Sequence, residues 1–439
     1  MKKLLSIISV FVLMLMIVGC SEQTTATTGE VIKFDETQVK AQVIRVWMDD
    51  SEGVFMDEII PAFEKLNPGI KVEFQHMGTV DIREKLKTYG KSGKGADVFQ
   101  FPHDHMAQAI LDDLVYVLPD ALKTRLEKRI IPVALNIATL CYDDETGSFE
   151  CAAGAEQRLF AVPISIESVT IYYNKALVQE ADLPKTFEDF LADSAAYRAA
   201  HEGQRYFATG SHWADAYFLQ GFYGAFGWTP FGPNLNDATQ VGFEDPKSLR
   251  AMEWMINNLK PEVTGTGTHN SINGSTLFEE GKLPFILTGP WNVPQYLKAG
   301  IDLGNITLPS INGVNPKTFA GAQMVSVYKY SKNADAAMKF VEFLQTDQAA
   351  EILYRTSGDC PALKDEILAT ITGIKDDKLI SVMLDQLSTS VPMPTIPEVT
   401  YYWGPAESMM KNIWNADGVI ATEAFTAEKA YKASRDMAS

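Results

Sequence analysis

Strand and helix patterns alternate near the start of the folded chain, and this alternation limits the folds that the sequence can adopt. Residues 43–47 and 70–74 have the pattern of β-strands, and an amphipathic helical stretch between them ends near residue 66. A second helical stretch over residues 83–89 precedes an apolar run at residues 96–101, which predicts a buried strand. This alternation predicts right-handed crossovers in an α/β sheet, whose ligands bind beyond the carboxyl ends of the strands.

A second α/β unit follows the first. Residues 160–163, 169–173 and 283–287 predict strands, residues 185–190 lead into a long helical stretch, and residues 334–353 have helical periodicity throughout. The chain has 439 residues, which is more than a single hydrophobic core accommodates. We therefore expect two α/β lobes.

The first twenty residues have the pattern of an export signal. Lys2 and Lys3 precede an apolar run at residues 4–16, and Gly19-Cys20 follows soon after it. The run is shorter than the roughly 20 apolar residues that a transmembrane helix needs. An aliphatic residue, a small residue, glycine and cysteine form a bacterial lipobox, so we expect residues 1–19 to be removed and Cys20 to carry acyl chains. The alternative is an ordinary signal peptide with a chance cysteine.

The polar sequence after Cys20 predicts a flexible tether over residues 20–41, because its first part has no apolar periodicity. We expect the protein to lie outside the cytoplasm, either on the outer face of the cell membrane or in a periplasm. The formal net charge of −18 argues against nucleic acid as a partner and against electrostatic adhesion to anionic lipid. The lipid on Cys20 would then supply the membrane attachment.

Three further cysteines remain. Cys141 and Cys151 bracket a segment whose Thr146-Gly147 predicts a hairpin turn. A disulfide across this hairpin is plausible outside the cytoplasm, and a pair of free thiols is the alternative. Cys360 is left without a partner, and we expect it to be buried.

Aromatic residues are concentrated at residues 213–231, where Trp213 and Tyr217 flank Asp215. Aromatic faces stack on the C–H groups of a pyranose ring, and carboxylates accept hydrogen bonds from sugar hydroxyl groups. Similar aromatic groups occur at Trp291 and Trp403. These clusters indicate sugar recognition, although a core helix with an aromatic face is the alternative for any one ring.

Catalytic and metal-binding motifs are missing from the sequence. Glu167 lies inside an apolar run, so it either has a structural partner or faces a cleft. His103, Asp104 and His105 form the only histidine cluster, and no second group of ligands has zinc-like spacing. No nucleophile elbow, phosphate loop or dinucleotide motif is present. We expect no metal, no cofactor and no enzymatic activity.

The ordered motifs of the chain resemble those of extracellular solute-binding proteins of carbohydrate ABC transporters, and most closely those of maltose/maltodextrin-binding proteins. The motifs that carry this resemblance are Asn67-Pro68-Gly69-Ile70-Lys71-Val72, Gly95-Ala96-Asp97-Val98, Phe160-Ala161-Val162-Pro163, Ile171-Tyr172-Tyr173-Asn174-Lys175, Pro184-Lys185-Thr186-Phe187, Gly289-Pro290-Trp291 and Met393-Pro394-Thr395-Ile396-Pro397, followed by Trp403. They span nearly all of the chain after residue 42.

The resemblance implies a type II periplasmic-binding-protein-like fold, with two α/β lobes joined by hinge crossings around a ligand cleft. The N-terminal lobe would comprise residues 42–165 and 325–368, and the C-terminal lobe residues 170–319 and 374–439.

The resemblance also implies a set of ligand-binding residues. Phe101, Tyr217, Trp291 and Trp403 match stacking positions, Asp104 and Glu167 match hydroxyl-binding carboxylates, and Met393 matches a cleft methionine. Asp215 stands where the family has a glutamate. The chain departs from the family at cationic positions: Glu52 replaces a lysine, with Asp49 and Asp50 close by, and His105 and Glu407 replace arginines.

These implications predict a monomeric, lipid-anchored receptor that captures an oligosaccharide, with maltose or maltodextrin expected, and delivers it to an ABC permease. One alternative is the same fold binding another neutral sugar or a polyol. The other alternative is a secreted glycoside hydrolase, because paired carboxylates about a glycosidic bond are what such enzymes use.

Overall fold

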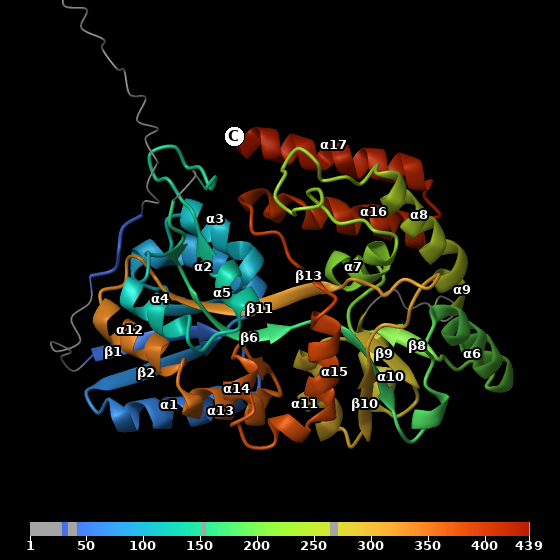
Figure 1. The fold of residues 1–439 in the computed structure, drawn as a ribbon, viewed down its shortest axis with the longest axis horizontal. Coiled ribbons are helices and arrows are strands. Elements are labelled where there is room, and N and C mark those ends of the chain that lie inside the picture. The colour runs from blue at the N-terminus through green and yellow to red at the C-terminus, as the bar shows by residue number, and fades with distance from the viewer. Residues whose placement is uncertain (1–28, 34–41, 152–154, 264–270, 439) are drawn as a thin grey trace, which may run out of the picture.

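The protein consists of two α/β lobes that lie side by side (Figure 1). The computed structural model describes residues 29–33, 42–151, 155–263 and 271–438. One large hydrophobic core fills the first lobe, and two separate clusters fill the second. Separate sheets with separate cores confirm the predicted α/β class.

The first lobe is built on a seven-stranded sheet. Its strands are β1 (Gln42–Met48), β2 (Ile70–His76), β3 (Val98–Pro102), β6 (Val162–Glu167), β11 (Phe319–Val327), β12 (Cys360–Pro361) and β13 (Val391–Pro392). β1 pairs in parallel with both β2 and β3, whereas β11 runs antiparallel to β3 and β6. The polar residues that follow β1 and β3 therefore lie at one edge of this sheet.

The second lobe is built on a four-stranded sheet in the order β10, β7, β9, β8. The strands are β7 (Thr170–Asn174), β8 (Phe207–Thr209), β9 (Phe285–Thr288) and β10 (Leu303–Ile306). A short pair, β4 (Thr139–Leu140) with β5 (Arg158–Leu159), lies outside both sheets.

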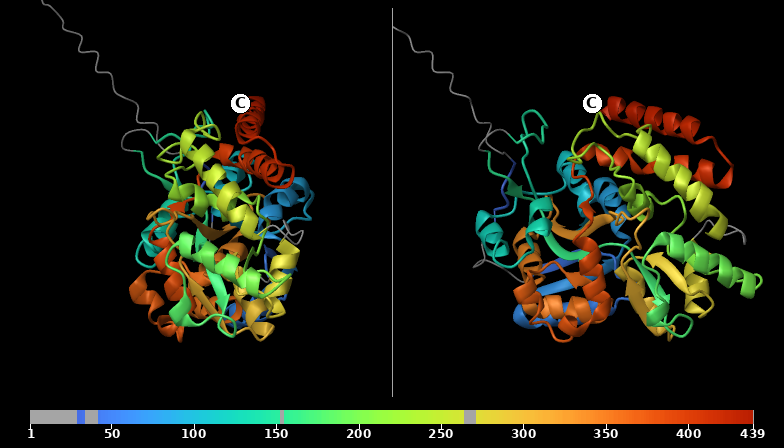
Figure 2. Two further views of the ribbon diagram at one scale, coloured as in Figure 1. Left: turned by 90° about the vertical axis from the view of Figure 1, so that its right-hand side faces the viewer. Right: turned by 45° about the vertical axis from the view of Figure 1, so that its right-hand side comes forward.

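Helices surround both sheets (Figures 1 and 2). Those of the first lobe are α1 (Val54–Leu66), α2 (Thr79–Tyr89), α3 (Met106–Leu111), α4 (Asp120–Leu126), α5 (Pro132–Ile137), α12 (Ala334–Phe343), α13 (Asp347–Ser357) and α14 (Asp365–Leu368). Those of the second are α6 (Phe187–Ala200), α7 (Ala216–Ala225), α8 (Pro246–Trp254), α9 (Lys260–Val263), α10 (Ser271–Glu279), α11 (Val293–Lys298), α15 (Lys378–Leu387), α16 (Trp403–Asn415) and α17 (Ile420–Ala438).

The chain passes between the lobes several times. It leaves the first sheet after β6, enters the second sheet at β7 after two intervening residues, and returns between β10 and β11. It crosses again between α14 and α15, and α15 contacts β10 and β7 of the second sheet. β13 lies within the predicted C-terminal lobe, yet it pairs with the first two residues of β11. The segment around Met393 is thus located at the junction of the lobes.

The helix expected over residues 334–353 is two helices. α12 ends at Phe343, and α13 begins at Asp347 after Thr346, whose hydroxyl oxygen accepts a hydrogen bond from the Ala349 amide. Such an N-cap satisfies an amide at the start of a new helix. Periodicity continues across this break because both helices place apolar residues in the same core.

Part of the predicted tether is packed against the first lobe. Val31 forms a parallel bridge with Val117, and two backbone hydrogen bonds flank it, from Ile32 to Val117 and from Val117 to Glu30. The Ile32 side chain is 4% exposed and belongs to the core of the first lobe. The tether is therefore shorter than residues 20–41. The predicted signal peptide at residues 1–19 and the Cys20 lipid site lie outside the described residues.

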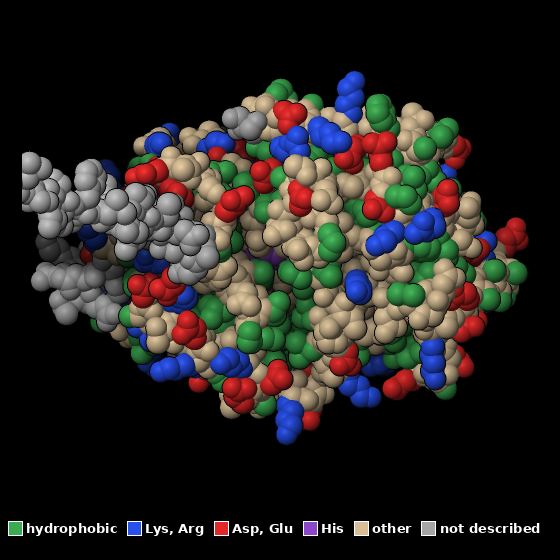
Figure 3. Space-filling model, turned by 45° about the horizontal axis from the view of Figure 1, so that its top comes forward, with side chains coloured by type: hydrophobic (Ala, Val, Ile, Leu, Met, Phe, Trp, Pro, Cys, Tyr) green, Lys and Arg blue, Asp and Glu red, His purple; other side chains and the backbone are tan. Residues whose placement is uncertain are grey.

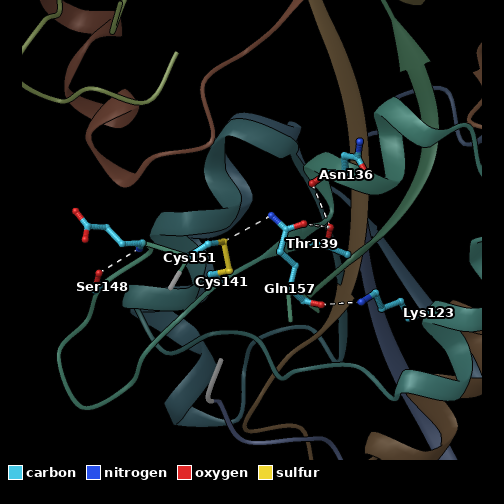
Figure 4. Close-up of a disulfide and its surroundings, with 8 residues drawn as sticks. Lys123, Asn136, Thr139, Cys141, Ser148, Cys151 and Gln157 are labelled. Atoms are coloured by element: carbon cyan, nitrogen blue, oxygen red, sulfur yellow. Dashed lines mark hydrogen bonds between the residues drawn. A yellow bond between two sulfur atoms is a disulfide. The ribbon is translucent and has the colours of Figure 1, made fainter. Parts of the chain in front are cut away.

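Cys141 and Cys151 form a disulfide that closes the hairpin beside β4 and β5 (Figure 4). Cys141 is buried and Cys151 is exposed, with the Gln157 amide nitrogen 3.9 Å from the Cys151 Sγ. Cys360 is a buried free thiol. A search of the described part of the chain finds no helix with the length and apolarity required to span a membrane.

Candidate functional site

A network of polar side chains connects the strands at the edge of the first sheet. The Asp49 amide donates to the Gln100 Oε1 at 3.0 Å, and the Gln100 Nε2 donates to the Gln323 Oε1 at 3.1 Å. The Gln323 Nε2 in turn donates to the Glu167 Oε1 at 3.0 Å. Thr79 joins the network through its hydroxyl to Gln323 and through its amide to Asp49. The network holds Glu167 at the point where the chain leaves the first lobe.

Glu167 is the most perturbed carboxyl in this network. Burial raises its pKa to about 8, the nearby Asp359 carboxylate adds to the rise, and the hydrogen bond from Gln323 opposes it. Asp359 has a pKa raised to about 6, again mainly through burial. At neutral pH Glu167 therefore retains its proton in this structure, and it can both donate and accept a hydrogen bond.

Tyr217 of α7 approaches Glu167 from the second lobe. A Cβ at Gly321 would lie 2.9 Å from the Glu167 Cγ and 3.0 Å from the Tyr217 hydroxyl, so only glycine fits between them. Burial, and then the Glu167 carboxylate, raises the pKa of Tyr217 well above its usual value. The Tyr217 hydroxyl is buried and has no hydrogen-bond partner among the described residues. It is therefore an unsatisfied polar atom beside Glu167.

Asp104 and Trp403 connect the two lobes directly. The indole Nε1 of Trp403, at the start of α16, donates to the Asp104 Oδ2 at 3.0 Å. Asp104 belongs to the short helix η2 (His103–His105) after β3 and is 3% exposed, whereas Trp403 packs against the core of the second lobe. The two predicted site residues thus meet across the junction.

Four aromatic rings form a row beside these carboxyl groups. The ring centroid of Tyr217 lies 6.2 Å from that of Trp291 and 6.1 Å from that of Phe319, and Phe319 lies 6.1 Å from Trp403. Trp291 is 38% exposed, so one end of the row is open to solvent. The face in Figure 3 is hollowed near its middle, where hydrophobic side chains gather. Aromatic rings beside carboxyl groups can bind a sugar chain.

Three expected ligand contacts differ in the structure. Phe101 is fully buried in the core of the first lobe and stacks on Phe99 at 5.1 Å, because residues two apart on a strand share a face. Its ring is not available for stacking on a sugar. Asp215 is the N-cap of α7, where it accepts from the amides of Tyr217 and Phe218 and from the Ser211 hydroxyl. Its oxygens are therefore used to start the helix.

The third difference concerns the loop after β1. The Asp50 Oδ2 accepts from the Met56 amide at 2.8 Å, and the Asp50 amide donates to the His76 Nδ1. Glu52 forms a 2.8 Å ion pair with Lys298 of α11, which joins the outer surfaces of the two lobes. Asp49 is exposed beside the polar network.

The remaining predicted residues lie at the junction. His105 is largely buried, burial lowers its pKa, and its Nδ1 has no partner among the described residues. Met393 is 5% exposed. The Met393 carbonyl accepts from the His103 Nε2 at 3.3 Å, while the His103 Nδ1 accepts from the Ala322 amide at 3.1 Å. His103 therefore ties η2 to β11 and to the segment after β13.

Sequence reasoning missed Gln323, Phe319 and Asp359. Gln323 and Phe319 lie on β11, at the boundary between the expected lobe segments 170–319 and 325–368, and Asp359 precedes the two-residue strand β12. Uncharged Gln and Phe give no local signal of a site. No group of three or more His, Cys, Asp or Glu in the described segments is arranged to hold a metal ion.

Comparison with known proteins assigns the family. Residues 49–351 match the family model described as bacterial extracellular solute-binding protein. The chain belongs to this family. That assignment confirms the predicted resemblance, and a family of solute-binding proteins agrees with the expectation of a binding protein rather than an enzyme.

Individual relatives share lower identity over most of the chain. A maltooligosaccharide ABC transporter solute-binding lipoprotein from Streptococcus pneumoniae is 28% identical over 405 residues, 90% of this chain and 88% of that protein. A galactooligosaccharide-binding protein from Bacillus subtilis is 26% identical over 381 residues, 85% of this chain and 85% of that protein.

The fold of the solute-binding protein matches solved structures. The crystal structure of MalX from Streptococcus pneumoniae in complex with maltopentaose superimposes with a TM-score of 0.76 at 26% identity, covering 89% of this chain and 100% of that one. A cyclo/maltodextrin-binding protein complexed with maltotetraose gives a TM-score of 0.71 at 23% identity. The predicted periplasmic-binding-protein fold is confirmed.

Proposed function

We propose that the protein captures a neutral oligosaccharide between its two lobes and delivers it to an ABC permease. The observation that carries this proposal is the row of Trp291, Tyr217, Phe319 and Trp403, which ends at the Trp403–Asp104 hydrogen bond between the lobes. A ligand that contacts both lobes would favour their closed arrangement, and a permease would then recognise that arrangement.

Maltodextrin is our first candidate ligand. The aromatic row suits a chain of glucose units, and a relative at 28% identity is named for maltooligosaccharide. Galactooligosaccharide is the second candidate, because a relative at 26% identity is named for it. The two identities are too close to separate these sugars.

We assign roles to the site residues as follows. The rings of Trp291, Tyr217 and Trp403 stack on sugar faces, and Asp104, Glu167 and Asp49 exchange hydrogen bonds with hydroxyl groups. His105 and Met393 line the junction near them. We further propose that residues 42–165 with 325–368, and residues 170–319 with 374–439, move as the two lobes.

Isothermal titration calorimetry tests the proposal. Residues 21–439 are titrated with maltose, maltotriose, maltopentaose and a galactotriose. Heat of binding from the glucose-based sugars alone, or from the galactotriose alone, would identify the ligand class. The absence of binding to every sugar would refute the proposed function. Incubation with maltopentaose followed by an assay for new reducing ends tests the glycoside hydrolase alternative, and sustained turnover would favour the enzyme.

We also propose that Cys20 carries the membrane anchor. The lipobox at residues 17–20 supports this proposal, as does the relative named as a lipoprotein. Intact-mass measurement of the protein purified from membranes should show a lipid adduct, and Cys20→Ser should release the protein from the membrane fraction. A protein that stays in the membrane fraction after this substitution would contradict the assignment.

A further inference from the structure

A histidine and a glutamate connect the helices that carry Tyr217 and Trp403, two of the aromatic site residues. The His212 Nε2 lies 3.1 Å from the Glu407 Oε1. His212 precedes α7, the helix of Tyr217, and Glu407 lies on α16, the helix that begins at Trp403. No role was assigned to this pair in the proposed function.

Hydrogen bonding fixes the direction of the histidine proton. The Ala214 amide donates to the His212 Nδ1 at 3.3 Å, so Nδ1 acts as the acceptor. The proton of the neutral ring is then on Nε2, where it points to Glu407. Lys411, one turn further along α16, contacts the same Glu407 oxygen.

The position of the pair places it next to the sugar-binding residues. Glu407 follows Trp403 by four residues on α16, so the two side chains lie on one face of the helix. His212 lies between Ser211, which donates to the Asp215 Oδ2, and the Asp215 cap of α7. The pair therefore borders the Trp403 end of the aromatic row.

The pair is also accessible to a ligand. The side chain of His212 is 29% exposed and that of Glu407 is 37% exposed. Both contacts of Glu407 within the described chain are made by Oε1, which leaves Oε2 to accept a further hydrogen bond. A carboxylate in this position accepts hydrogen bonds from hydroxyl groups and repels another carboxylate.

We infer that His212 and Glu407 are specificity-determining residues, which recognise the hydroxyl groups of a neutral sugar unit at the Trp403 end and disfavour an acidic unit there. The inference rests on the proposed function, because it assigns the chemistry at one end of the same site. Glu407 provides the acceptor and the negative charge, and His212 holds the Glu407 carboxylate in place.

Neutral and acidic forms of one oligosaccharide provide the test. The probes are maltopentaose and two analogues with a single carboxylate, one oxidised at the reducing end and one at C6 of the non-reducing end; a galactotetraose set is measured in parallel. Wild type should bind the neutral sugar at least tenfold more tightly than one of its two acidic analogues. Glu407→Gln should reduce this ratio at least threefold, and Glu407→Arg should reduce it further.

The variants have matched controls. His212→Ala should weaken binding of the neutral sugar about fivefold, whereas Glu253→Gln, an exposed carboxylate on α8, should change neither the affinity nor the ratio. Wild-type affinities and ratios in all Glu407 and His212 variants would overturn the inference and leave the proposed function intact. If wild type binds no sugar in either set, the proposed function and the inference both fail.

Discussion

The Glu167 carboxyl shows how far the fold changes the chemistry of a single residue. A glutamate within an apolar run could be predicted to have a partner or to face a cleft. Its pKa, however, depends on burial and on Asp359, which is 192 residues further along the chain. In the unfolded chain this carboxyl would titrate near 4.5, and in the fold near 8. Between these values the folded state holds a proton that the unfolded state has lost, so stability falls as pH rises.

We therefore predict a pH-dependent difference between wild type and Glu167→Gln. Comparing pH 6.5 with pH 8 keeps the comparison above the pKa of about 6 at Asp359. Over this interval wild type should lose about 1 kcal/mol per pH unit relative to the variant, because the variant has no carboxyl to ionise. Urea unfolding without sugar measures the difference. A constant difference at both pH values would contradict the raised pKa, and Glu253→Gln serves as the control.

Trp403 combines a stacking surface with a hydrogen bond, and two substitutions separate them. Trp403→Phe keeps an aromatic ring but removes the donor to Asp104, so we expect about a fivefold loss of sugar affinity. Trp403→Ala removes the ring as well and should weaken binding more than tenfold. Calorimetry with the best-bound sugar measures both, and circular dichroism checks the fold. Equal affinity of Trp403→Ala and wild type would remove Trp403 from the site.

At the scale of elements, local patterns predicted the first strands and helices of the chain, but not α7, β11 and α16, which carry Tyr217, Phe319 and Trp403. β1, α1, β2 and β3 begin and end within a few residues of the expected bounds, because each has its own periodicity and stop signals. The break between α12 and α13 was missed because one core receives both helices. The stacking role of Phe101 came from the resemblance, whereas the apolar run at residues 96–101 had predicted a buried strand, which the structure confirms.

The disulfide hairpin is an element whose contribution can be measured separately from binding. Cys141 and Cys151 are 10 residues apart, and a loop of this length restricts the unfolded chain by about 2–3 kcal/mol. We predict that the double variant Cys141→Ala with Cys151→Ala melts several °C lower and binds sugar as wild type does, since the hairpin contributes no residue to the aromatic row. Scanning calorimetry and titration test both statements. Unchanged melting, or a loss of affinity, would contradict this assignment.

At the scale of the whole molecule, the site depends on contacts that no local pattern encodes. Gln323 connects Gln100 to Glu167, and His103 connects Ala322 to Met393, across sequence separations of more than 150 residues. The family resemblance supplied a set of expected site residues, and their roles in binding stay predictions. It did not predict that Asp215 would cap α7, a local contact with the amides of the next residues. It also did not predict that Glu52 would pair with Lys298, a contact that depends on how the lobes meet.

The packed segment at residues 29–33 gives the molecule a defined attachment to its N-terminus. If Cys20 carries the lipid, the nine residues from Cys20 to Gly29 span at most about 30 Å. A tether that is free up to residue 42 would instead span at most about 75 Å. The bridge between Val31 and Val117 would therefore keep the first lobe close to the membrane and leave the second lobe to move.

This attachment predicts a local change in hydrogen exchange. The Val117 amide donates to the Glu30 carbonyl, whereas the neighbouring Leu118 amide donates to the Leu159 carbonyl. Ile32→Asp places a charge in the core position of Ile32 and should release the segment, so the Val117 amide should exchange at least tenfold faster. The Leu118 amide is the internal control and should keep its rate, as should sugar affinity. Unchanged protection at Val117 would show that the segment does not hold the lobe, and the tether would then extend to residue 41.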